Sequence, residues 1–141
     1  MDPSSPIELA ALVRRERRAV LSTVSPDGAP EAALVGLAAL DDGTLILNAA
    51  ETARKIGNIR HEPRVALVIG TGDEFSVQVE GVAEVAAGSE RLRLGDAYDA
   101  QYPGSRSLHD GFAVVVVRPT WVRVYDLTRD PHADEARWPL R

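Results

Sequence analysis

Two adjacent cations, Arg54 and Lys55, stand where an apolar strand pattern gives way to a helical one, and Lys55 is the only lysine in the chain. The start of a helix carries the positive end of the helix dipole, so each cation there costs about 0.3–1 kcal/mol. A bound anion would reverse that sign, because the backbone N–H groups and both side chains would converge on it. The segment 51–60 is therefore either an anion site that begins near Thr52 or a short helix with two exposed basic residues. Spacing alone does not separate these interpretations.

A second basic cluster comprises Arg14, Arg15, Arg17 and Arg18. One interpretation is a solvated helix end, where cations suit the negative end of the dipole. The other is a basic track for a long polyanionic ligand.

Other chemistry is restricted by what the sequence lacks. It has no cysteine, which excludes disulfides, thiolate catalysis and cysteine-based metal sites. The motifs G-x-S-x-G, H-E-x-x-H and G-x-G-x-x-G and the phosphate-binding P-loop are absent. His61, His109 and His132 are scattered without ligand spacing. We therefore expect no metal site, and no catalytic residue can be named.

Size and charge limit the classes of protein. With 141 residues, 45% of them hydrophobic, the chain is expected to form one domain over residues 1–141, with its core in about 8–126 and an irregular tail at 127–141. A net charge of −5 disfavours nucleic acid as the main partner. The N-terminus does not resemble a signal peptide, and the apolar runs are too short to cross a membrane. We expect a cytoplasmic protein.

Three helices are predicted to support these residues. Ser5, Pro6 and Glu8 form a capping-box pattern that begins a helix over about 6–18. The second helix covers 51–60, and the third covers 88–102.

Seven strands are predicted over 19–24, 32–40, 44–49, 64–70, 75–85, 112–118 and 120–126, joined largely by tight turns. Residues 75–85 alternate between apolar and polar side chains. The sequence therefore predicts a mainly β fold, an antiparallel split β-barrel with flanking helices.

Two of these strands, 32–40 and the first part of 112–118, are apolar on both faces. An antiparallel strand usually shows one face to water, so helices or a second subunit must cover the other face. Because the chain has few helices, we expect a homodimer.

The sequence resembles the pyridoxamine 5′-phosphate oxidase-like family of flavin-binding split barrels, including its deazaflavin-binding branch. The resemblance covers roughly residues 8–126. It rests on T-V-S-P-D-G-A-P, D-D-G-T-L-I-L, A-R-K-I-G-N-I-R-H-E-P-R-V-A-L-V and Q-V-E-G-V-A-E-V, followed by the closing strands V-V-V-V-R-P-T-W-V-R-V-Y-D.

The resemblance implies a homodimer with two cofactor sites in grooves between the subunits. Arg54 and Lys55 would hold the cofactor phosphate. The ring system would lie along the second and third strands, near Val35, Gly36, Leu47, Asn48 and Ala49. Gln78 would face the cofactor, and Trp121 or Trp138 of the other subunit could close off the ring. The cofactor would supply the hydride chemistry.

The sequence also departs from the oxidases proper. Residues 32–40 carry no charge, where those enzymes have an arginine, and the C-terminal residues lack their substrate-phosphate pattern. The sequence thus favours an FMN-dependent oxidoreductase whose small-molecule substrate is not pyridoxamine 5′-phosphate. One alternative is a reductase that uses the deazaflavin coenzyme F-420, whose oligoglutamate tail would follow the Arg14–Arg18 cluster. The other is a non-catalytic flavin-binding or interaction protein.

Overall fold

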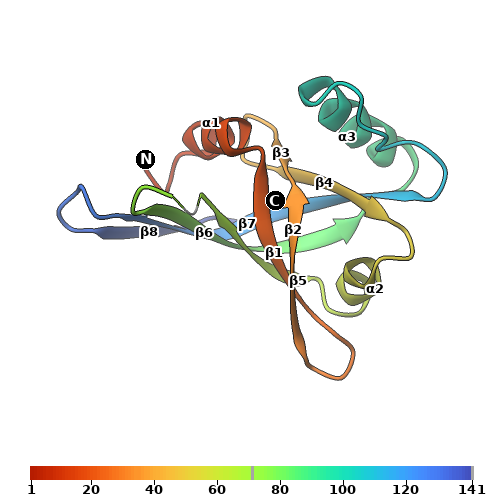
Figure 1. The fold of residues 1–141 in the computed structure, drawn as a ribbon, viewed down its shortest axis with the longest axis horizontal. Helices are drawn as coiled ribbons and strands as arrows, with labels where there is room; N and C mark the ends of the chain where they lie inside the picture. The colour runs from red at the N-terminus through yellow and green to blue at the C-terminus, as the bar shows by residue number, and fades with distance from the viewer. Residues whose placement is uncertain (71, 141) are drawn as a thin grey trace.

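The computed structural model describes residues 1–70 and 72–140, which form three helices and eight strands in one sheet (Figure 1). The helices are α1 (Pro6–Glu16), α2 (Arg54–His61) and α3 (Gly88–Gln101). The strands are β1 (Arg18–Val24), β2 (Pro30–Gly36), β3 (Ala38–Ala39), β4 (Leu45–Ala50), β5 (Arg64–Ile69), β6 (Phe75–Val85), β7 (Phe112–Asp126) and β8 (Ala133–Arg137).

The strand order is β2-β1-β5-β6-β7-β4-β3, with β8 also paired to β7, and every pairing is antiparallel. The sheet curls around a core formed by one of its faces, as expected of a split β-barrel. The prediction of a mainly β split barrel is confirmed. The pattern of short alternating strands was therefore a sufficient guide to the fold class.

Helices α1 and α2 both add side chains to this core. Leu9, Leu12 and Val13 of α1 pack into it, as do Ile56 and Ile59 of α2. The Ser5 hydroxyl accepts a hydrogen bond from the Glu8 N–H at 3.2 Å, which confirms the predicted cap of α1. The helix ends at Glu16, before the predicted end, because Arg17 turns into the left-handed region at φ 68°.

Helix α3 lies on the other face of the sheet. Leu94 and Tyr98 pack there with Ile46 of β4 and with Val114 and Val116 of β7. For the apolar strand 112–118, the cover therefore comes from α3 and not from a second subunit.

The outer face of β2 has no such cover. Leu34 is 65% exposed and Val20 of β1 is 37% exposed. The register places Val20 between Leu34 on β2 and Val68 on β5. We call Val20, Leu34 and Val68 the open sheet patch.

Two strands differ from their predicted limits. The predicted strand 32–40 is interrupted at Leu37, whose N–H donates to the Arg17 carbonyl at 3.0 Å, and so becomes β2 and β3. The two strands predicted on either side of Pro119 are a single strand, β7, with a bulge opposite Glu80 and Gly81. The bulge adds one residue to β7 and lets the pairing with β6 continue past the proline.

The tail at 127–141 was predicted to be irregular, but part of it forms a strand. β8 pairs with β7, and the Trp138 indole N–H donates to the Pro3 carbonyl at 2.8 Å. This contact ties the C-terminal segment to the N-terminal one. Among the described residues, no helix has the length and apolar character needed to cross a membrane.

Gly81→Ala is expected to destabilise the fold by about 1–3 kcal/mol, because there is no room for the added methyl group. A Cβ at Gly81 would lie 2.7 Å from the Arg118 carbonyl oxygen on the paired strand. Urea unfolding measures the effect. Gly57→Ala is the control, since a Cβ there meets nothing within 4 Å and alanine suits a helix better than glycine. Equal stability of the two variants would contradict the assigned close approach of β6 and β7.

Candidate functional site

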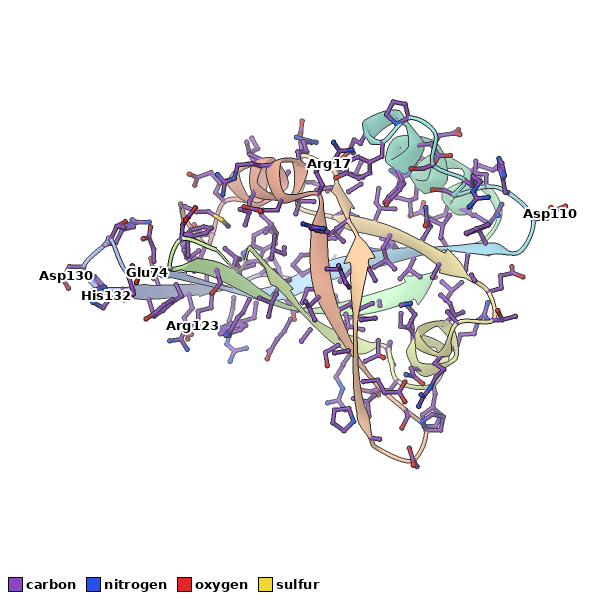
Figure 2. All side chains as sticks on the ribbon, in the orientation of Figure 1. Arg17, Glu74, Asp110, Arg123, Asp130 and His132 are labelled. Atoms are coloured by element: carbon purple, nitrogen blue, oxygen red, sulfur yellow. The ribbon has the colours of Figure 1, made fainter. Side chains whose placement is uncertain are left out.

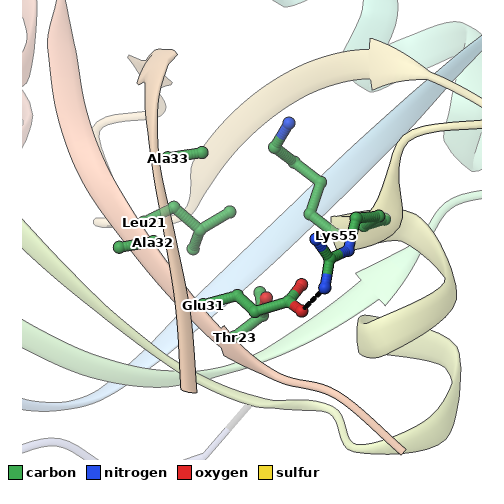
Figure 3. Close-up of a pocket in the computed structure, with 7 residues that line it drawn as sticks. Leu21, Thr23, Glu31, Ala32, Ala33 and Lys55 are labelled. Carbon is green, nitrogen blue, oxygen red and sulfur yellow. Dashed lines mark hydrogen bonds and ion pairs between the residues drawn. The ribbon is translucent and has the colours of Figure 1, made fainter. Parts of the chain in front are cut away.

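A groove of about 470 Å³ opens between β1, β2 and the start of α2 (Figure 3). Its lining residues are Leu21, Thr23, Glu31, Ala32, Ala33, Arg54 and Lys55. The two predicted phosphate-binding residues therefore lie together in a cavity of the size that small ligands occupy.

Helix α2 begins at this groove without a side-chain cap. Its N-cap residue Ala53 makes no side-chain hydrogen bond to the helix, and the first turn contains no acidic residue. The Ile56 N–H donates to the Ala53 carbonyl at 3.0 Å, which leaves the N–H groups of Arg54 and Lys55 facing an end of the helix dipole that favours an anion.

Lys55 is half-buried and extends along the groove toward Ala33 (Figure 3). Within the described parts of the chain, its ammonium group has neither an ion-pair nor a hydrogen-bond partner. A half-buried cation beside an uncapped helix start is an arrangement of charge that favours a bound anion.

Arg54 is already paired. Its guanidinium contacts the carboxylate of Glu31 on β2, and the other oxygen of Glu31 accepts from the Asn58 amide at 2.8 Å. The same amide donates to the Thr23 hydroxyl at 3.0 Å. Asn58 is buried, so the network fixes the position of Glu31 inside the groove.

Sequence reasoning missed Glu31 and Asn58, although each leaves a signal. Glu31 alternates with Ala33 and Val35 on the inward face of β2. Asn58 is the polar residue between the buried Ile56 and Ile59 on α2. A charged residue and an amide at inward positions favour a polar contact inside the fold.

The predicted ring-binding residues are not among those that line the groove. Val35, Leu47 and Ala49 pack in the core, and the Asn48 amide donates to the Ser107 hydroxyl at 2.8 Å. Gly36 has no side chain, and the Tyr98 hydroxyl occupies the space where a Cβ on that residue would lie. Burial raises the pKa of Tyr98, so this phenol stays neutral where α3 packs on the sheet.

Four further candidates lie elsewhere. Thr52 is exposed just before α2 begins. Gln78 on β6 and Trp121 on β7 are on the outer side of the sheet, opposite the core. Trp138 contacts the N-terminal segment of its own chain. It remains a prediction that Gln78 faces the cofactor and that Trp121 or Trp138 of a second subunit closes off the ring.

The basic cluster is divided among several contacts. Arg14 binds Asp41 at 2.8 Å and the Ala39 carbonyl at 3.0 Å. Arg17 stacks over Tyr102, 4.9 Å from the ring centroid, at the junction of α1 and α3 (Figure 2). Arg15 and Arg18 are exposed. None of these four side chains is among the residues that line the groove.

None of the three histidines lines the groove. His132 lies at the tip of the β7–β8 hairpin, at the opposite end of the molecule from α2 (Figure 2). His61 and His109 are exposed and do not line the groove. In residues 1–70 and 72–140, no cluster of three His, Asp or Glu side chains could hold a metal ion.

The fold is that of a split-barrel protein, and the groove beside α2 brings together the two predicted phosphate-binding residues, Arg54 and Lys55. The sequence model of the family described as pyridoxamine 5′-phosphate oxidase matches residues 5–126, and the chain belongs to that family. No curated protein matches its sequence.

Solved structures that share this fold belong to proteins with different names. A haem-binding protein of Mycobacterium smegmatis is 23% identical at a TM-score of 0.77, and the match covers 97% of this chain and 59% of that one. The chain thus spans about three fifths of that protein. A conserved hypothetical protein of Mycobacterium tuberculosis is 27% identical at a TM-score of 0.70, with 83% and 81% covered. General stress protein 26 of Bacillus anthracis is 22% identical at a TM-score of 0.72, with 93% and 97% covered.

Proposed function

We propose that this protein is a homodimeric oxidoreductase that binds FMN in the groove beside α2 and acts on a small-molecule substrate. The observation that carries the proposal is Lys55, a half-buried cation without a partner in the described chain, placed at an uncapped helix start. FMN carries a single terminal phosphate, which suits a site of this size.

In this assignment the phosphate binds the Lys55 ammonium group and the backbone N–H groups of Arg54 and Lys55 at the start of α2. Leu21 and Ala33 provide an apolar wall next to it. When bound, the flavin supplies the hydride chemistry. The chain contributes charge at the phosphate, a wall that excludes water, and strands that fix the orientation of the ligand.

The open sheet patch supports the homodimer. Val20 and Leu34 expose apolar side chains next to each other, and residues Ala32 and Ala66 beside them are small and exposed. Contact between two such surfaces would bury the apolar area of β2 that α3 leaves uncovered. This contact would also place a second subunit near the groove, because β2 provides residues to the groove and to the open sheet patch.

A deazaflavin reductase is the second candidate. Its oligoglutamate tail needs a continuous basic surface, whereas Arg14 and Arg17 are engaged with Asp41 and Tyr102. This distribution favours FMN. A non-catalytic binding protein is the third candidate, because the groove contains no evident general acid apart from the paired Glu31.

Titration of the purified chain tests the proposal. We expect FMN to bind with a change in its absorption and fluorescence, and riboflavin to bind more weakly because it lacks the phosphate. Equal affinity for FMN and riboflavin would contradict the phosphate site. Binding of deazaflavin alone would support the second candidate, and binding of neither would support the third. Haem is included because one structural neighbour is described as a haem-binding protein; a haem spectrum without flavin binding would overturn the proposal.

A further inference from the structure

We propose that Glu31 is a specificity-determining residue, whose carboxylate competes with the ligand phosphate for Arg54. This inference rests on the proposed function of the groove. It concerns a negative charge that the phosphate site already contains, and it explains why only one of the two cations there is free to bind an anion.

The groove contains two cations and one anion. Arg54 and Lys55 come from adjacent positions on α2, and Glu31 reaches them from β2 (Figure 3). A phosphate monoester carries a charge of about −1.5 to −2 near pH 7. Such a ligand meets only one net positive charge from these side chains, and repulsion from Glu31 opposes its approach to Arg54.

Glu31 is held firmly in this position. Its side chain is 21% exposed, and its two oxygens have different partners, Arg54 and the buried Asn58. The Asn58 amide is itself fixed by its bond to the Thr23 hydroxyl. Rotation of Glu31 out of the groove would leave a buried amide hydrogen without an acceptor, which is costly.

The Arg54 side chain is the mobile member of the pair. It is 83% exposed, and an exposed ion pair contributes little to stability. A ligand phosphate can draw Arg54 away only against the attraction of Glu31. Phosphate recognition therefore depends mainly on Lys55 and α2, and binding is weaker and more readily reversed than it would be with both cations free.

Glu31→Gln tests this inference. Glutamine keeps an oxygen that can accept from Asn58 and removes the charge. We expect the dissociation constant for FMN to fall by roughly tenfold or more, while that for riboflavin changes by less than about threefold. An unchanged or weaker affinity for FMN, or an equal gain for riboflavin, would overturn the inference.

Glu62→Gln is the matched control. The Glu62 side chain is 26% exposed and also pairs with an arginine, Arg64, but it does not line the groove. Removing its charge should leave both affinities unchanged. If it tightens FMN binding as much as Glu31→Gln does, the gain reflects net charge alone and the inference fails.

Inorganic phosphate separates this inference from the proposed function. If the wild-type protein does not distinguish FMN from riboflavin, the proposed function fails, and the thermal unfolding midpoint is then measured with increasing phosphate. A larger phosphate-dependent rise for Glu31→Gln than for the wild type and Glu62→Gln supports competition by Glu31. Equal rises for all three proteins overturn it.

Discussion

Lys55→Glu is expected to weaken FMN binding by about 2–4 kcal/mol, or roughly 30- to 700-fold in Kd. The substitution removes a charge-assisted contact and introduces a second carboxylate into a groove that already contains Glu31. Riboflavin, which has no phosphate, should lose much less affinity. Paired fluorescence titrations measure both values.

Arg60→Glu is the control for this variant. Arg60 lies on the same helix and is exposed, but it does not line the groove. Arg60→Glu changes the net charge by the same amount as Lys55→Glu. Because the changed charge lies outside the groove, its effect on FMN affinity should be small. Thermal unfolding should show folded protein for both variants. Loss of FMN affinity in both would indicate a general charge effect, and no loss in Lys55→Glu would place the phosphate elsewhere.

Leu34→Glu is expected to convert the proposed dimer into a monomer. Leu34 is 65% exposed in a single subunit, so the substitution should be tolerated by the isolated fold. In a twofold interface each change occurs twice, and a carboxylate buried without a partner costs several kcal/mol. We expect the dissociation constant of the dimer to rise by at least about 100-fold.

Light scattering at micromolar concentration measures this effect. The wild type should have the mass of a dimer and Leu34→Glu that of a monomer. Leu92→Glu is the matched control, since Leu92 is 54% exposed on α3, away from the open sheet patch. A monomeric wild type, or a dimer that survives Leu34→Glu, would contradict an interface at this patch.

The sequence predicted the fold well wherever the alternation of apolar and polar residues shows which side chains are buried. The alternation in 75–85 continues through the bulge at Gly81, and the Ser5 cap starts α1 as predicted. It was a poorer guide to what covers an apolar surface. Val114 and Val116 show only that something packs on them, and the partner, α3, comes from an earlier part of the chain. β8 was missed because its A-D-E-A-R sequence has no apolar alternation, and its position depends on backbone pairing with β7.

For the site, the sequence indicated the cations but not their surroundings. Arg54 and Lys55 are adjacent, so their shared location needs no knowledge of the fold. Glu31 is 23 residues from Arg54 and 27 residues from Asn58, and only the sheet brings the three together. Contacts of that kind depend on strand register and on the direction in which α2 leaves β4. A single sequence does not specify them.

The uneven cover of the sheet also limits how the protein could assemble. α3 occupies the outer side of β4 and β7, whereas the open sheet patch lies on β2, β1 and β5. A surface that pairs with its own copy across a twofold axis is fully used once two subunits have met. Association through this patch would therefore close at a pair and would not extend into a filament, even though β2 is an edge strand of the sheet.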